Sequence, residues 1–101
     1  MKIKASGARG SWFAKVDGES LPCVHQHWIS GSKHCDPEVA SDGKWPEFIE
    51  AIQTGKKVIV TKDDITTWQR TGYVAVFRVD NVVVDDAGLR FDLVERVCDL
   101  K

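Results

Sequence analysis

The chain has 101 residues, 43% of them hydrophobic and 29% charged, which is typical of a folded globular domain and argues against disorder. This length leaves room for one hydrophobic core, so we expect residues 1–101 to form a single domain. The formal net charge of -1 disfavours binding to duplex DNA, which generally needs a strong positive excess.

Neither a membrane span nor an export signal is expected. No run approaches the roughly 20 apolar residues of a spanning helix, and the charged start over 1–7 is followed by no apolar stretch. The three cysteines, Cys23, Cys35 and Cys98, are an odd number without the spacing of a disulfide framework. We therefore expect a cytoplasmic protein with reduced thiols and no membrane association.

The first predicted elements form a β-hairpin. In the segment 11–16 the apolar residues that share one face by the two-residue period are Trp12, Ala14 and Val16. The pair Asp17-Gly18 then supplies a turn, because glycine accepts a positive φ without a Cβ clash. A second strand is predicted over 21–28.

A long loop and one helix are predicted next. Residues 29–44 are rich in turn-forming residues and read as a loop of a length that is often functional. A helix is predicted over 45–54, because Pro46 suits a first turn and Gly55 suits a terminator. Its apolar face would comprise Trp45, Phe48, Ile49 and Ile52.

The second half is predicted to be rich in strands. A short buried strand is expected over 57–61, a long central strand over 73–79, and a hairpin that joins 82–84 to 89–93. Beyond 93 the alternation loses its phase, and the residues fit a short helix or a bulged strand, with strand preferred. About six strands and one helix predict an α+β fold, a small curled sheet or open β-barrel that the helix plugs on one side.

One cluster contains all three histidines and two of the three cysteines: Cys23, His25, His27, His34 and Cys35. If 21–28 is a strand, Cys23, His25 and His27 share one face, and thiolate with imidazole is the ligand set that Zn²⁺ or Cu prefers. The spacing matches no standard zinc pattern, so solvent-facing histidines without a metal are the competing interpretation.

The same segment also suggests a thiol enzyme. A histidine close to Cys23 or Cys35 could activate the thiolate as a nucleophile, with Asp36 or Asp17 as the orienting group. Such groups meet in space and not along the chain, and buried unreactive cysteine is the commoner case.

A second candidate site lies further along, in the polar run 66–71. There Trp68 stands among polar residues with Arg70 nearby, which is the combination that stacks on a base or another planar ligand. The alternative is that Trp68 folds back as a lid on the core.

The central part of the chain resembles PUA-like domains of the ASCH and EVE type. A helix leads into the segment 55–62, where Gly55 and Lys57 match the ASCH pattern, while Val60 replaces its Glu and Lys62 its Arg. The resemblance implies a small β-barrel with a cleft for RNA or a modified base, and the missing Glu argues against the family's proposed catalysis. The implied cleft residues are Lys57, Lys62, Trp68 and Arg70. In general character the chain is also similar to small proteins of mobile gene (integron) cassettes.

Two functional hypotheses stay open at this point. One is a non-enzymatic binding module for a nucleotide, an RNA base or another small planar ligand. The other is a metal- or thiol-dependent enzyme that uses the 23–35 cluster, with Zn as the implied cofactor. An oligomerising structural protein is a third option, with a second copy of the chain as the partner.

Overall fold

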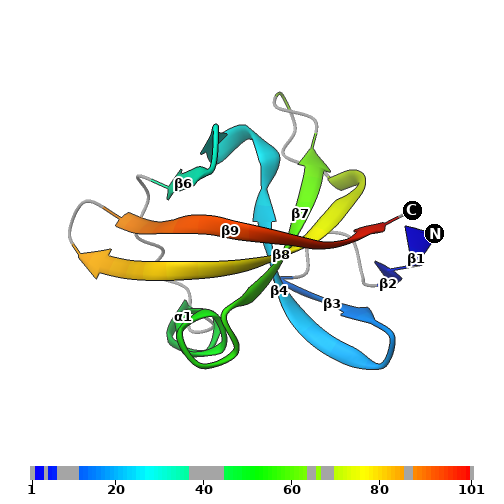
Figure 1. The fold of residues 1–101 in the computed structure, drawn as a ribbon, viewed down its shortest axis with the longest axis horizontal. Helices are drawn as coiled ribbons and strands as arrows, with labels where there is room; N and C mark the ends of the chain where they lie inside the picture. Colours follow the sequence, from blue (N-terminus) through cyan, green and yellow to red (C-terminus); the bar gives the residue numbers. More distant parts are fainter. Residues whose placement is uncertain are drawn as a thin grey trace.

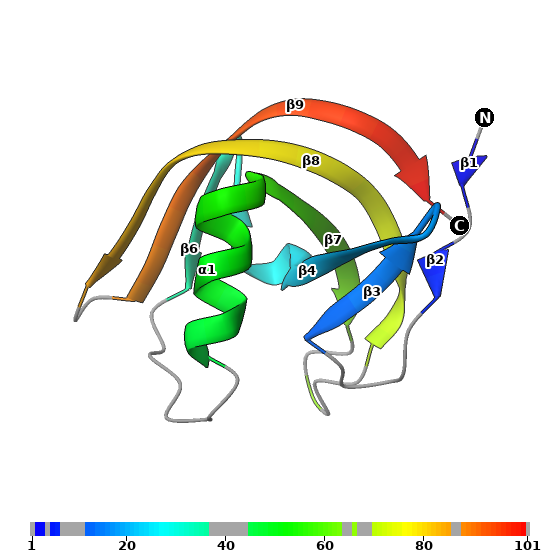
Figure 2. The same cartoon turned by 90° about the horizontal axis from the view of Figure 1, so that it is seen from below.

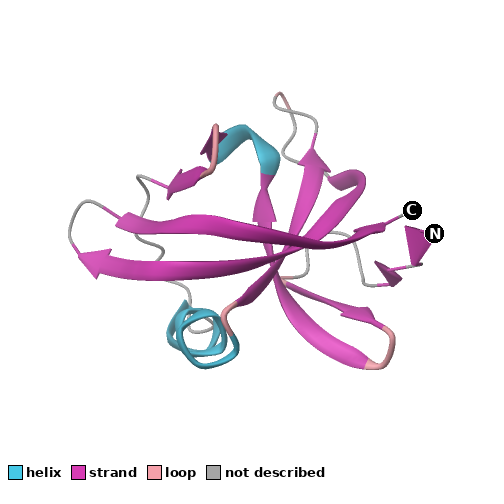
Figure 3. Cartoon of the chain, in the orientation of Figure 1, coloured by secondary structure: helices cyan, strands magenta, loops and turns pink. Residues whose placement is uncertain are grey.

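The computed structural model describes residues 2–3, 5–6, 12–36, 45–63, 66, 70–85 and 88–100. Figure 3 distinguishes the helices from the strands. Their bounds, in chain order, are β1 (Lys2–Ile3), β2 (Ala5–Ser6), β3 (Phe13–Val16), β4 (Glu19–His25), the 3₁₀ turn η1 (Gln26–Trp28), β5 (Ile29–Ser30), β6 (Lys33–Asp36), α1 (Trp45–Gly55), β7 (Lys57–Asp63), β8 (Arg70–Asp85) and β9 (Gly88–Leu100).

The strands form a mixed, strongly curved sheet (Figure 1). They pair in the order β2-β3-β4-β7-β8-β9-β6-β5, and β1 pairs with β9 beside this path. The β4–β7 and β1–β9 pairs are parallel and the others antiparallel. Figure 2 shows β8 and β9 arching over α1, which lies in the hollow beneath them. The prediction of a strand-rich α+β domain with one main helix near 45–54 is confirmed.

Both faces of the sheet carry buried residues. The helix-side core, on the concave face, comprises Val24, Phe48, Ile49, Ile52, Val58, Val60, Val79, Leu89 and Phe91. The second core, on the opposite face, comprises Ala5, Ala14, Val16, Leu21, Ile59, Val76 and Leu100. Strand β7 serves both, because Val58 and Val60 enter the helix-side core while Ile59 between them enters the second. Within the described ranges no helix is long and apolar enough to cross a membrane.

The predicted strand over 21–28 is wrong at its end, and so is part of the predicted loop. β4 stops at His25, because the chain turns through η1, where the Ile29 N–H donates to the Gln26 carbonyl. β5 and β6 then form a hairpin around Gly31, whose φ of 63° is a conformation that favours glycine. Residues 37–44 of the predicted loop lie outside the described ranges.

Trp12 does not share a face with Ala14 and Val16, as the alternation predicted. It precedes β3, so the two-residue period does not extend to it. Its carbonyl accepts a hydrogen bond from the Cys23 N–H at 2.9 Å, and its ring packs edge-to-face on Phe48 of α1 at 5.1 Å between centroids. Trp12 therefore packs against the helix-side core, whereas Ala14 and Val16 belong to the second.

The segments 73–79 and 82–84 were predicted as separate strands, but they form one strand, β8. The chain passes between them through Asn81, whose φ of 54° lies in the left-handed region that asparagine tolerates better than most residues. Its N–H donates to Asp80 Oδ1 and its Nδ2 to Asp92 Oδ2, both at 2.9 Å. These bonds hold the irregularity within a continuous strand.

Candidate functional site

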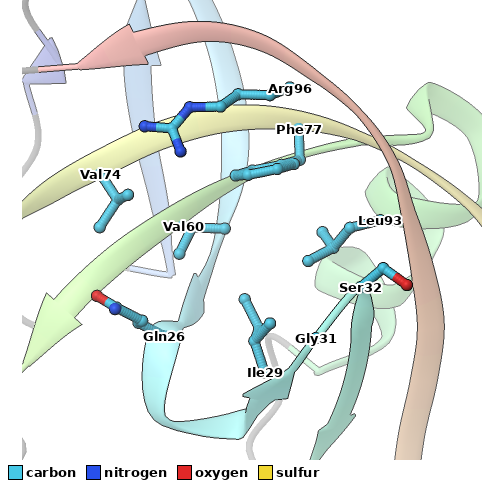
Figure 4. Close-up of a pocket in the computed structure, with 9 residues that line it drawn as sticks. All are labelled: Gln26, Ile29, Gly31, Ser32, Val60, Val74, Phe77, Leu93 and Arg96. Carbon is cyan, nitrogen blue, oxygen red and sulfur yellow. The ribbon is translucent and has the colours of Figure 1, made fainter.

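A mostly apolar cavity of about 270 Å³ opens on the concave face of the sheet (Figure 4). Its apolar wall comprises Ile29, Val60, Val74, Phe77 and Leu93. The polar part of its lining comes from Gln26, Ser32, Arg96 and the backbone of Gly31. Segments distant in the sequence therefore meet here: η1 and β5 on one side, and β7, β8 and β9 on the other.

The cavity continues the helix-side core. Four of its apolar residues, Ile29, Val74, Phe77 and Leu93, pack against that core yet are only partly buried. α1 fills one part of the concave face with Phe48, Ile49 and Ile52, and the cavity occupies another part of the same face. An apolar surface that the protein leaves only half-covered is what a small-molecule site requires.

A β-bulge brings Val74 into the cavity wall. The register pairs Thr61 with Tyr73 and Val60 with Ala75, so Val74 has no partner on β7 and is the extra residue of β8. The bulge lets Val74 pack against the helix-side core although Tyr73 and Val76 pack against the second. Such irregularities re-aim side chains next to functional sites more often than elsewhere in sheets.

Phe77 and Arg96 form the part of the wall with the most distinctive chemistry. They are register partners on β8 and β9, so their side chains lie on the same face of the sheet. The guanidinium carbon lies 5.7 Å from the centroid of the Phe77 ring, and Arg96 Nε donates to Asp99 Oδ1 at 2.6 Å. Ring and carboxylate together orient the guanidinium at the rim of the cavity. Figure 4 shows Arg96 beside Phe77 in the wall.

The four residues predicted to bind a planar ligand are only partly brought together, and neither Lys57 nor Lys62, the two whose side chains the structure describes, lines this cavity. Lys62 and the backbone of Arg70 lie close together, because Lys62 pairs with Gly72 and the next residue, Asp63, pairs with Arg70. Lys57 lies at the opposite end of β7, about 16 Å away at strand spacing, and its Nζ is 3.8 Å from the Glu19 carboxylate. Trp68 and the side chain of Arg70 lie outside the description, so their part in a site stays a prediction.

The predicted metal ligands are also spread over several elements. Cys23 and His25 share one face of β4, but His27 lies in η1, where its ring contacts Trp28 edge-to-face at 5.1 Å. The prediction that His27 joins the other two on one strand face is therefore wrong, because the strand ends before it. Among the side chains that the structure describes, no three of His, Cys, Asp and Glu lie close enough to hold a metal ion.

The remaining two predicted ligands are His34 and Cys35, which lie in β6. Their backbones pair with Phe91 and Arg90 of β9, and their side chains lie outside the description. A zinc site that includes them stays a prediction.

The described cysteines are far apart. Register pairs run from Cys23 through Ile59 and Val76 to Cys98, so three inter-strand steps of about 4.8 Å separate the two cysteines by roughly 14 Å along the sheet. A disulfide needs Cα atoms within about 7 Å. Cys23 and Cys98 form no disulfide with each other, and a thiol site could not combine these two.

The sequence reasoning missed the residues that define the cavity. Arg96 carried a usable signal, since it is the one basic residue of the segment 93–100 and it follows the point where the alternation breaks. Gln26 was missed because it is the first residue of η1, directly after β4, where the sequence predicted a continuing strand. Phe77 carried no sequence signal for a binding site, because an aromatic residue in a central strand is normally a core residue.

The chain was also compared with protein-family models, with curated proteins and with solved structures, and none of the three comparisons finds a match.

Proposed function

We propose that this protein is a non-enzymatic binding module that holds a nucleobase or another small planar ligand in the cavity on the concave face of its curled, barrel-like sheet. The observation that carries the proposal is the wall itself: an aromatic ring and four aliphatic side chains, with Gln26 and Arg96 at the edge. Apolar walls with a few polar groups are the usual composition of small-molecule sites.

The cavity size limits the ligand. Liquid water occupies about 30 Å³ per molecule, so 270 Å³ accommodates on the order of ten non-hydrogen atoms. This is the size of a purine base or an indole. A nucleotide or an RNA strand would place its base inside and its sugar and phosphate outside.

Lys62 supports the nucleotide form of this proposal. It is exposed, and the two-residue period of β7 places it on the same face as Val60 of the cavity wall, about 7 Å further along the strand. A phosphate that leaves the cavity at this end would meet the Lys62 ammonium. This position agrees with the resemblance to PUA-like domains, which implied Lys62 as a cleft residue.

The test is titration of the ¹⁵N-labelled protein with adenine, uracil and indole, followed by heteronuclear NMR. We expect at least one probe to shift the amide signals of Ile29, Phe77 and Leu93, with a dissociation constant of roughly a millimolar or tighter. The variant Ile29→Trp fills the cavity from β5 and should abolish these shifts. Val94→Trp adds the same ring at a side chain that is 51% exposed and outside the lining, and should leave binding unchanged.

Absence of shifts with all three probes, or equal binding by Ile29→Trp and the wild type, would contradict the proposal. A melting temperature of Ile29→Trp equal to or above that of the wild type would show that the indole fills existing space.

A further inference from the structure

We infer that the ligand of this cavity is a planar acid, whose single carboxylate is bound by the guanidinium of Arg96 while its ring lies against Phe77. This inference rests on the proposed function and names the chemical class of the ligand. It is carried by the juxtaposition of one oriented arginine with a mostly apolar lining that holds no other charge among the residues the structure describes.

The charge of the lining supports an anionic ligand. Arg96 is the one charged residue among those that line the cavity in the described part of the chain. The remaining lining offers an amide at Gln26 and a hydroxyl at Ser32, which carry no charge. Within the described lining, a negative group on the ligand is therefore complemented only at Arg96. Lys62 lies outside this lining and would meet only a group that extends out of the cavity.

The geometry of Arg96 suits a carboxylate. Its Nε is already bonded to Asp99, and its carbon lies over Phe77, so both contacts favour one orientation of the guanidinium before a ligand arrives. The N–H groups of the two terminal nitrogens form a planar fork that pairs with both oxygens of a carboxylate. Asp99 is half-exposed and solvent screens its charge, so it orients the fork with little repulsion of a second anion.

The size of the cavity suits a small acid. The cavity accommodates on the order of ten non-hydrogen atoms, which corresponds to one or two fused rings with a short acidic arm. The ring would pack against Phe77 and the aliphatic residues, and the arm would reach the rim at Arg96. An aromatic carboxylate such as indole-3-acetate has both parts, and indole-3-acetamide is its neutral match in size and shape.

The experiment compares these two probes on the full chain. The wild type should bind indole-3-acetate about tenfold or more tightly than indole-3-acetamide, since only the carboxylate carries a charge and can accept two parallel hydrogen bonds from the guanidinium. Arg96→Gln should abolish this preference. Arg78→Gln is the matched control, because Arg78 is similarly exposed and ion-paired, to Glu95, but lies outside the cavity lining, and the preference should remain.

Salt gives a second readout that needs no variant. Raising NaCl from a low to a physiological concentration should weaken binding of the acid and leave that of the amide unchanged. Equal binding of acid and amide, or a preference for the acid that survives Arg96→Gln, would overturn the inference while the proposed function stands. Binding of neither probe, nor of adenine or uracil, would overturn both.

Discussion

Phe77 and Arg96 show how one cross-strand pair can serve both stability and binding. The guanidinium covers one side of the ring, and the cavity lies beside it, so the aromatic residue is packed without being fully buried. An arginine over an aromatic face contributes about 0.5–1 kcal/mol at exposed sites. The pair therefore favours its bound-like arrangement without a ligand, which reduces the entropy lost on binding.

Phe77→Leu tests the contribution of the ring. The change keeps an apolar side chain but removes the aromatic face, so we expect the affinity for indole to fall about two- to tenfold, since an aromatic pair contributes about 0.5–1.5 kcal/mol beyond its buried area. The same titration measures it, with Val94→Ala on the exposed part of β9 as the control. An unchanged affinity would mean that indole does not lie on Phe77.

Asn81 is a single residue on which the shape of β8 depends. Asn81→Val should lower the free energy of unfolding by about 1–3 kcal/mol, because a β-branched residue is strained at a φ of 54° and the side-chain bond to Asp92 is lost. Asn81→Gly relieves the strain and loses only the bond, so it should be the less destabilised of the two. Urea unfolding compares them, and equal stability of the two variants would show that φ is not the cause.

Asp80 should make stability depend on pH. The hydrogen bond from the Asn81 N–H, followed by the charge of Lys56 at 3.6 Å, lowers the pKa of Asp80 below its ordinary value. A lowered pKa in the folded state stabilises the protein above the unfolded-state pKa, and this contribution is lost as pH falls through the folded-state value. Asp80→Asn should therefore be less stable than the wild type at neutral pH, and the difference should shrink below about pH 4. A difference that stays constant down to pH 2 would contradict this assignment.

At the scale of elements, strand β9 shows what the sequence could and could not predict. Its register with β8 skips Val94 and Val97, so two bulges interrupt the alternation, and both residues are about half exposed. These bulges are the physical reason that the pattern lost its phase after Leu93. The helix was predictable because its apolar period, its proline and its terminating glycine all indicate the same helix. The turn η1 was not predictable, because His25, His27 and their neighbours continue a strand-like alternation.

α1 is expected to stabilise the concave face through its buried residues. Ile52 is fully buried in the helix-side core, so Ile52→Ala should cost about 2–5 kcal/mol in the free energy of unfolding. Gln53→Ala, on the exposed face one residue later, should change stability by less than about 0.5 kcal/mol. Denaturant unfolding of both variants measures the contrast, and a small effect of Ile52→Ala would mean that α1 packs only loosely on the sheet.

At the scale of the whole molecule, the site arises from pairings between distant parts of the chain. β4 pairs in parallel with β7 across the intervening hairpin and helix, and β6 returns to pair with β9. No local pattern specifies these partners, so the cavity between η1, β5 and β7–β9 could not be derived from the sequence. The chemistry that the sequence did suggest, a planar ligand in a strand-rich domain, remains the proposal. We place the ligand at Phe77 and Arg96, while a role for Trp68 and the Arg70 side chain, which lie outside the description, stays a prediction.

The most direct measurement of the central claim is an intermolecular NOE experiment on methyl-labelled protein with bound indole or indole-3-acetate. The account predicts NOEs from the ring protons of the probe to the methyl groups of Ile29, Val60 and Leu93, because these residues enclose the cavity. NOEs confined to the exposed methyl groups of Val83 or Val97 would place the probe on the surface and contradict a ligand site on the concave face.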